Sequence, residues 1–227
     1  MNISKEQLLS EQIENMLVER NLRGMKDLQP HLVSGYCLRA ASLLKDVKGN
    51  VLIGTGFPVE NTFETDGPVG AIILYHALEK LGATPVLVCS TTMAAAFESD
   101  YQTYAINVGK QAHGLAEAKR AIDYFQPEVI ISIESPGLAD NDCYHNMRGE
   151  DISSKVASFD YFMQAANCPT IAIGDGGNEI GMGNVKDALG SVDGVTRKNE
   201  LTEDSLPATE GIALISRIRT LIGFSFT

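Results

Sequence analysis

The fold of this chain is decided by Pro169-Thr170-Ile171-Ala172-Ile173 and the residues directly after it, Gly174-Asp175-Gly176-Gly177-Asn178-Glu179-Ile180-Gly181-Met182-Gly183. The apolar first part has the length of a buried strand and ends abruptly at a glycine. In the second part, carboxylate and amide side chains are separated by five glycines within ten residues. Glycine permits positive φ and close approach to the backbone, and open α/β sheets bind ligands at the carboxyl ends of their strands. We therefore predict a polar site here; the alternative is a tight turn into a helix that Asp175 or Asn178 caps.

Outward from this stretch, short apolar runs alternate with amphipathic segments. Strands are predicted over 51–57, 85–89, 128–133 and 170–173, and helices over 68–81, 110–125 and 158–167. Residues 91–108 are less regular, and we expect a short helix there. Alternation of strands and helices at this spacing is typical of a parallel sheet with helices on both faces. The predicted fold class is therefore α/β, a three-layer Rossmann-like domain with a mostly parallel sheet.

Two amphipathic N-terminal helices are expected before the first strand. The first begins at the capping residue Ser4 and stops at Gly24, and the second covers 32–49. The apolar stripe of the first consists of Leu9, Ile13, Met16 and Leu17. Towards the other end, 192–197 is predicted as a fifth strand and 208–222 as a helix. The chain is thus expected to be a single domain, with a helical lead-in (1–48), a core (49–190) and a C-terminal segment (191–227).

The composition disfavours several classes of function. Of the 227 residues, 44% are hydrophobic, enough for a sizeable core, and the formal net charge of −11 disfavours binding to nucleic acid. No apolar run reaches the length of a membrane span and the first residues form no leader pattern, so we expect no membrane association and a cytoplasmic location. The four cysteines form no Cys-x-x-Cys pair, which favours buried thiols over a zinc site or disulfides. Because the Gly-x-Gly-x-x-Gly fingerprint is missing, no nicotinamide or flavin cofactor is expected.

Polar residues also come after the first predicted strand. Gly54-Thr55-Gly56 ends that strand, and Glu64-Thr65-Asp66-Gly67 opens the next helix. A glycine-rich strand end that faces a helix N-terminus offers unpaired N–H groups to an anion. Glu64 and Asp66 would repel the anion unless a cation intervenes, so we expect a metal-bridged ligand or a ligand with an amino group. The alternative is that Thr65 or Asp66 only caps the helix.

The third predicted strand leads into Glu134, and Asn146 and Arg148 lie in the next loop. Glu134 comes directly after an apolar run and should seek a partner, for which the planar fork of Arg148 is suited, so we expect either a structural Glu134–Arg148 pair or a catalytic role. Oxygen-rich sites without cysteine or clustered histidine suit Mg²⁺ or Mn²⁺. The predicted metal ligands are Glu64, Asp66 and Asp175. The same residues could instead bind an amino acid directly, with Arg148 on its carboxylate and the acids on its ammonium group.

Four of these motifs together resemble the D-glutamate cyclase-like C-terminal domain family. They are Gly54-Thr55-Gly56-Phe57-Pro58, Glu64-Thr65-Asp66-Gly67-Pro68, Asn146-Met147-Arg148-Gly149 and the glycine-rich stretch 174–183. The resemblance extends over about 28–185. The chain differs at Ser135, where the family's Glu-Arg-Pro-Gly motif has arginine, and it contains no tryptophan for the family's Ser-Asn-Trp-Gly element. In the larger eukaryotic members this domain comes after a separate cyclase-type domain, and the whole is associated with converting D-glutamate to 5-oxo-D-proline by loss of water.

The resemblance implies a lyase that acts on a small acidic amino acid at the carboxyl ends of the strands. The expected catalytic residues are Glu134, Arg148, Asp175 and Glu179. The expected ligand-binding residues are Gly54, Thr55, Gly56, Thr65, Asp66, Gly67, Asn146, Gly176, Gly177 and Asn178. Arg148 would hold a carboxylate, glycine-rich N–H groups would stabilise developing negative charge, and Glu134 or Glu179 would move protons. The alternatives are a non-catalytic ligand- or metal-binding regulatory module, with catalysis in a partner domain or protein, and a divalent-metal-dependent phosphate-ester hydrolase. The expected partners are a small acidic molecule and either a second copy of the chain or a cyclase-type domain.

Overall fold

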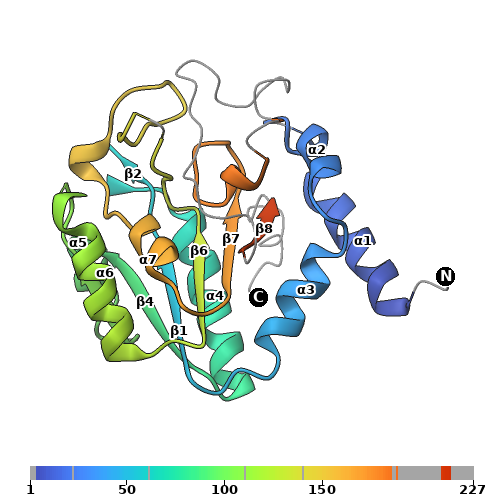
Figure 1. The fold of residues 1–227 in the computed structure, drawn as a ribbon, viewed down its shortest axis with the longest axis horizontal. Coiled ribbons are helices and arrows are strands. Elements are labelled where there is room, and N and C mark those ends of the chain that lie inside the picture. Colours follow the sequence, from blue (N-terminus) through green and yellow to red (C-terminus); the bar gives the residue numbers. More distant parts are fainter. Residues whose placement is uncertain are drawn as a thin grey trace, which may run out of the picture.

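The computed structural model describes residues 4–21, 23–60, 62–109, 111–139, 141–185, 188 and 211–215. Its centre is a six-stranded parallel sheet (Figure 1). The strands of this sheet are β1 (Asn50–Thr55), β4 (Thr84–Ser90), β5 (Thr103–Ile106), β6 (Val129–Ile133), β7 (Thr170–Gly174) and β8 (Gly211–Ile215). They lie in the order β5-β4-β1-β6-β7-β8, which is the strand order of the Rossmann fold. The predicted fold class is confirmed.

Helices cover both faces of the sheet. On one face lie α3 (Tyr36–Leu44) and α4 (Asp66–Leu81), and on the other lie α6 (Gln111–Phe125) and α7 (Asp160–Ala165). Neighbouring strand residues point to opposite faces, so Ile53 and Ile131 enter one hydrophobic cluster and Leu52 and Ile130 the other, all fully buried. Because the strands are buried on both faces, they form continuous apolar runs in the sequence. This is why four of the six were predictable.

The remaining elements are short or peripheral. They are α1 (Lys5–Val18), α2 (Met25–Leu28), α5 (Thr91–Phe97), the antiparallel pair β2 (Pro58–Val59) and β3 (Thr62–Phe63), and three turns of 3₁₀ helix, η1 (Gln29–His31), η2 (Ser153–Lys155) and η3 (Met182–Val185). In Figure 1, α1 and α2 lie beyond α3, on the flank of the sheet near β8. No helix of the described residues is long and apolar enough to cross a membrane.

The first N-terminal helix forms, but two of the four residues of its apolar stripe are exposed. Leu9 and Met16 of the apolar stripe are 57% and 49% exposed, whereas Ser10 and Glu14 are buried. The Glu14 carboxylate accepts the backbone N–H groups of Gly35 and Cys37, each at 3.0 Å, at the start of α3. A helix N-terminus has unpaired N–H groups and a positive dipole end, so a buried carboxylate is stabilised there. Hydrogen-bonding demand therefore overrides hydrophobic periodicity in α1.

Two further segments differ from the sequence predictions. The irregular region 91–108 contains the expected helix, α5, but also the unpredicted edge strand β5. The predicted C-terminal helix is wrong over Gly211–Ile215, which forms β8 and pairs in parallel with β7. A short apolar run is compatible with a helix or a strand. The edge of β7 offers unpaired backbone N–H and C=O groups, and pairing with them favours the strand. The strand predicted over 192–197 lies outside the described residues.

Candidate active site

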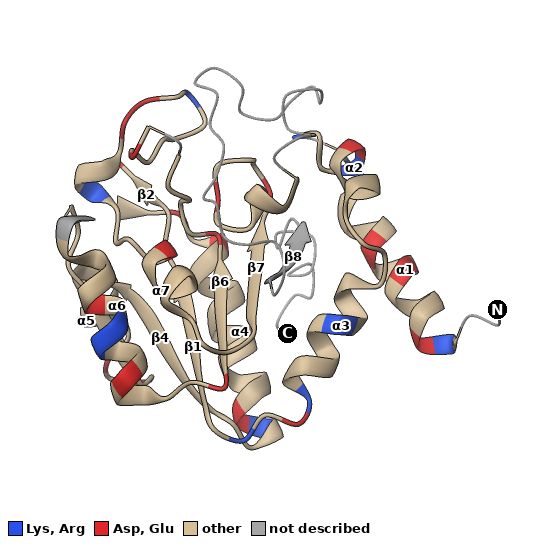
Figure 2. Cartoon of the chain, viewed as in Figure 1, with Lys and Arg blue, Asp and Glu red and all other residues tan. Residues whose placement is uncertain are grey.

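The acidic residues after β6 and β7 lie next to the point where the strand order reverses, between β1 and β6. In an open α/β sheet, this switch point leaves a crevice outside the carboxyl ends of the strands, here beside β1 and β6. Figure 2 shows acidic residues near the ends of β6 and β7. Glu134 comes directly after β6 and has a φ of 49°, a left-handed conformation that costs a non-glycine residue about 1–2 kcal/mol. Strain of this kind is typical of functional sites.

The N-terminus of α4 packs closely against Glu134. A Cβ atom at Gly67 would lie 2.8 Å from the Glu134 Cβ and 3.0 Å from the Thr55 Oγ1. This close approach explains why glycine occupies the start of the helix. The Thr55 hydroxyl is buried and has no hydrogen-bond partner among the described residues. Thr55 and Gly67, both predicted ligand-binding residues, therefore lie beside Glu134.

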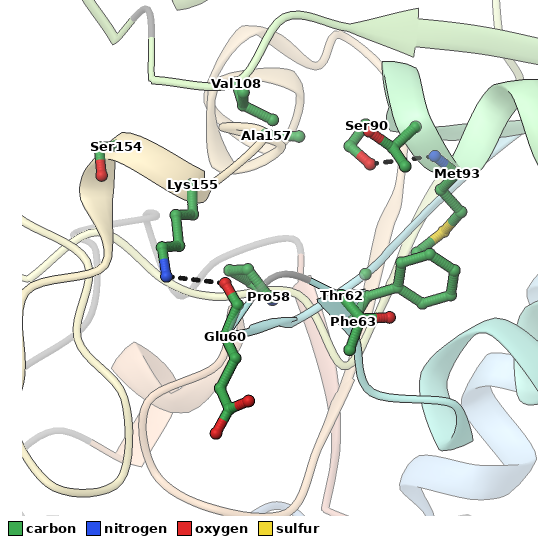
Figure 3. A pocket seen from close by; sticks show the side chains of 12 residues that line it. Pro58, Glu60, Thr62, Phe63, Ser90, Met93, Val108, Ser154, Lys155 and Ala157 are labelled. Atoms are coloured by element: carbon green, nitrogen blue, oxygen red, sulfur yellow. Dashed lines mark hydrogen bonds between the residues drawn. The ribbon is translucent and has the colours of Figure 1, made fainter.

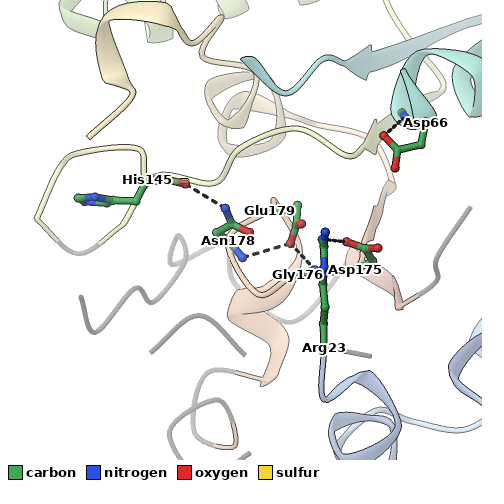
Figure 4. A network of polar contacts seen from close by, with 8 residues as sticks. Arg23, Asp66, His145, Asp175, Gly176, Asn178 and Glu179 are labelled. Carbon is green, nitrogen blue, oxygen red and sulfur yellow. Dashed lines mark hydrogen bonds and ion pairs between the residues drawn. The ribbon is translucent and has the colours of Figure 1, made fainter. Parts of the chain in front are cut away.

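The glycine-rich loop after β7 folds around the Glu179 carboxylate (Figure 4). Its Oε2 accepts the N–H groups of Gly176 at 3.0 Å and Asn178 at 3.1 Å. A Cβ at Gly176 would come within 2.7 Å of the Glu179 Oε1 and 3.0 Å of the Asn178 Oδ1, so the loop needs glycine there. Asn178 donates its Nδ2–H to the His145 carbonyl at 3.0 Å, which ties this loop to the loop after β6. This loop leads from β7 into the 3₁₀ turn η3. The alternative, a tight turn into a helix capped by Asp175 or Asn178, was wrong.

Three carboxylates meet at this point. Glu134, Asp175 and Glu179, called the acidic trio below, are 5%, 5% and 3% exposed, and each has an oxygen within 4.8 Å of the others. Burial, together with the charges of Glu179, Asp175 and Asp66, raises the pKa of Glu134 well above its ordinary value. Burial and Asp175 raise the pKa of Glu179 to about 7, although the Gly176 N–H and Arg23 oppose the shift. Protons or a bound cation relieve such crowding of like charges.

Arg23 brings a positive charge to the acidic trio, and no sequence motif predicts it. Its guanidinium forms an ion pair with Asp175, and both are drawn in Figure 4. Burial lowers the pKa of Arg23, but nearby carboxylates outweigh this effect and raise it; they belong to Asp175, Glu179, Glu64 and Glu134. Arg23 lies 152 residues from Asp175 in the sequence and in no motif, so only the tertiary fold reveals it.

Arg148, the arginine expected at the site, lies in the loop after β6. It is exposed, and its backbone N–H donates to the Asn146 Oδ1 at 2.9 Å within the same loop. The expected Glu134–Arg148 pair does not occur among the hydrogen bonds and ion pairs of the described residues. The side chain of Asn146 holds this loop together, since it also bonds the carboxylate and the backbone N–H of Glu150. His145 of the same loop is buried. The catalytic role of Arg148 and the ligand-binding role of Asn146 stay predictions.

The remaining predicted residues surround the trio or the end of β1. Asp66 begins α4 and its Oδ1 accepts the Gly67 N–H at 3.3 Å, while Thr65 occupies the cap position without a side-chain bond to the helix. A Cβ at Gly54 would lie 2.2 Å from the Phe159 ring, so glycine at this position lets the ring pack against the end of β1. Gly177 has a φ of 92°, which glycine adopts without strain.

The acidic trio fits a divalent cation better than the predicted ligand set does. Of Glu64, Asp66 and Asp175, only Asp175 belongs to the group of carboxylates that converge. The Asn178 Oδ1 is buried, has no hydrogen-bond partner among the described residues and, like the Glu179 Oε1, lies close to Gly176. Carboxylate and amide oxygens are the ligands that Mg²⁺ and Mn²⁺ prefer. Glu64 and Asp66 are half-buried and influence Arg23 and Glu134 electrostatically rather than joining the trio.

A separate cavity of about 280 Å³ opens at the ends of β1 and β4, beside the β2–β3 pair (Figure 3). Met93 and Phe63 form part of an apolar wall, and Gly56, a predicted ligand-binding residue, lines it. Lys155 closes one side and donates to the Glu60 carbonyl at 2.7 Å. The carboxyl edge of the sheet therefore carries the acidic trio after β6 and β7, and a largely apolar cavity at the ends of β1 and β4.

Fold and site define a class, namely a Rossmann-type α/β protein with a buried acidic cluster at the switch point. Within it, the chain matches the family described as D-glutamate cyclase-like, C-terminal, over residues 13–191, and it belongs to that family. It is 32% identical over 199 residues to the human (Homo sapiens) mitochondrial D-glutamate cyclase, a match that covers 75% of this chain and 32% of the relative. The chain therefore spans about a third of the length of this curated relative.

Two solved structures show a weak resemblance to the chain. A short-chain dehydrogenase/reductase variant from Serratia marcescens has a TM-score of 0.32 at 16% identity, with 57% of this chain and 58% of that chain covered. An aldohexose dehydrogenase from Thermoplasma acidophilum has a TM-score of 0.31 at 12% identity, with 60% and 51% covered. Likeness at this level supports no inference about function.

Proposed function

We propose that this chain is a hydro-lyase of the D-glutamate cyclase type, which closes a small acidic amino acid onto itself with loss of water. The observation that carries the proposal is the acidic trio, in which two buried carboxylic groups have raised pKa values and one of them titrates near neutral pH. A general acid or base is most effective when its pKa lies near the working pH. The family match supports the choice of D-glutamate as the first substrate to test.

The reaction needs two proton transfers. The amino nitrogen of D-glutamate attacks the side-chain carboxyl carbon, a C–N bond forms, and one carboxyl oxygen leaves as water. The nitrogen must lose protons and the leaving oxygen must gain them. Glu134, whose pKa burial raises well above its ordinary value, is suited to donate to the leaving oxygen, and Glu179, with a pKa of about 7, is suited to accept from the nitrogen.

The glycine-rich loop plays a different part from the one expected. The N–H groups of Gly176 and Asn178 already bond the Glu179 carboxylate, so in this arrangement they hold the base rather than an oxyanion. Mg²⁺ or Mn²⁺ at the acidic trio would supply positive charge that polarises a substrate carboxyl group. In that arrangement the carboxylates of the trio would be ligands of the ion, in place of the proton-transfer roles given above to Glu134 and Glu179.

A regulatory module is the second candidate, because this chain spans only about a third of the length of the human relative. In that case the trio binds a ligand or a divalent ion and catalysis resides in a partner domain. A metal-dependent phosphate-ester hydrolase remains a third candidate, since clustered carboxylates also hold the ions of such enzymes.

Incubating the purified chain with D-glutamate, with and without Mg²⁺ or Mn²⁺, tests the proposal. We expect 5-oxoproline in the wild-type reaction and its loss in Glu134→Gln, whereas Glu19→Gln, at an exposed site, should behave as wild type. Absence of 5-oxoproline under every condition rules out the lyase. Calorimetric binding of D-glutamate or the ions without turnover would favour the module, and release of phosphate from a generic ester substrate would favour the hydrolase.

A further inference from the structure

Arg23 stands at the edge of the acidic trio, between the buried carboxylates and solvent. Its side chain is 31% exposed, whereas the side chain of its partner Asp175 is 6% exposed. The remaining charged neighbours that influence Arg23 are carboxylates. A ligand that enters from solvent with its own carboxylate would be repelled by the trio, so it needs a cation at this position.

Arg23 has hydrogen-bond donors to offer. A guanidinium group has five N–H donors, and Nη1 of Arg23 donates to the Asp175 Oδ1. Its side chain forms no other hydrogen bond with the part of the chain that the structure describes. Because the guanidinium is a planar fork, its other donors can bind the two oxygens of a carboxylate side by side.

The turn that carries Arg23 is held in place. Asn21 has a φ of 45°, its Oδ1 accepts the Lys26 N–H at 2.9 Å, and its Nδ2 donates to the Asp27 Oδ2 at 2.8 Å. After the turn, the buried side chains of α2 pack with those of η3, the element directly after the glycine-rich loop. The buried residues of this contact are Val18, Met25, Leu28, Met182, Val185 and Ala188. The N-terminal segment is therefore anchored directly beside the site.

We propose that Arg23 binds a carboxylate of the acidic ligand, so that the turn between α1 and α2 forms part of the binding site. The inference rests on the proposed function only for the class of ligand, a small molecule with at least one carboxylate. Pairing with Asp175 fixes one edge of the guanidinium and leaves other donors for the ligand. The acidic trio is then left for the ligand's amino group and for the carboxyl group that reacts with it.

Binding and turnover measured on three variants test this inference. D-Glutamate and glutarate, which lacks the amino group, serve as calorimetric probes. Losing hydrogen bonds to a charged group weakens binding by about 10- to 100-fold, so we expect Kd and KM to rise by this factor in Arg23→Gln, with a smaller change in kcat. Arg23→Lys keeps a positive charge beside Asp175 but loses the fork, and should weaken binding while melting like wild type. Arg20→Gln, at an exposed arginine of the same segment, should change nothing.

The outcomes separate this inference from the proposed reaction. Binding that is lost in Arg23→Gln, without any turnover by wild type, upholds the role of Arg23 and rejects the lyase. Turnover with Kd and KM unchanged in both Arg23 variants upholds the lyase and overturns the role of Arg23. If Arg23→Gln fails to fold, the Kd of Arg23→Lys decides alone. If wild type binds neither probe, the inference is wrong.

Discussion

Replacing Glu179 with glutamine should stabilise the protein above neutral pH while abolishing its activity. The pKa of Glu179 is raised from 4.5 to about 7 in the folded state. Between these pH values the folded protein keeps a proton that the unfolded chain has lost, so the free energy of unfolding falls as the pH rises through this window. At about 1.4 kcal/mol per pKa unit, the free energy of unfolding falls by about 3 kcal/mol, and this fall is complete above pH 7. Glutamine has no charge to titrate, and its carbonyl oxygen can accept the same two N–H groups.

The assay is urea denaturation of wild type and Glu179→Gln at pH 5 and pH 8. At pH 5 the two proteins should be about equally stable, and at pH 8 the variant should be more stable by about 3 kcal/mol, or about 6–12 °C in Tm for a protein of this size. Glu19→Gln, at an exposed position, should behave like wild type at both pH values. If the stability difference between wild type and Glu179→Gln does not change with pH, Glu179 does not carry a raised pKa and the electrostatic argument for the site fails.

Three other perturbations probe the site and the fold. Asp175→Asn should lose ligand binding but change the free energy of unfolding by only about 1 kcal/mol. The reason is that less repulsion among the carboxylates of the trio offsets the ion pair lost by the partly exposed Arg23. A large drop in Tm with binding intact would show that Asp175 is structural. Saturating Mn²⁺ at about 100 times its Kd should add about 2.7 kcal/mol of stability to wild type and little to Glu134→Gln, as measured by thermal melting; equal shifts would place the ion elsewhere. Gly54→Ala, whose Cβ would lie 2.2 Å from the Phe159 ring, should destabilise by about 1–3 kcal/mol, and Phe159→Leu should restore part of the loss; unchanged stability would contradict the packing role.

The acidic site was predictable where it depends on strand ends. Glu134, Asp175 and Glu179 each come after a recognisable buried strand, and parallel strands bring their carboxyl ends to one edge of the sheet. The partner of these acids was not predictable. The planar fork of Arg148 is suited to pair with Glu134, but Arg148 is exposed, and Arg23 pairs with Asp175 of the trio instead. The metal-ligand roles of Glu64 and Asp66 stay predictions: both are close in sequence to a glycine-rich turn, but neither belongs to the group of carboxylates that converge.

The sequence by itself determined the layered α/β architecture, because strands buried on both faces must be short, apolar and separated by helices. It also determined the glycine-rich loop after β7, where only glycine leaves room for the Glu179 side chain. Tertiary structure alone decided which face of α1 is buried, since Glu14 pairs with N–H groups of α3 that no periodicity reveals. It also decided which arginine enters the site. Both depend on contacts between residues far apart in the chain, and the energy of a buried charge depends on every charge around it in space, not on its neighbours in sequence.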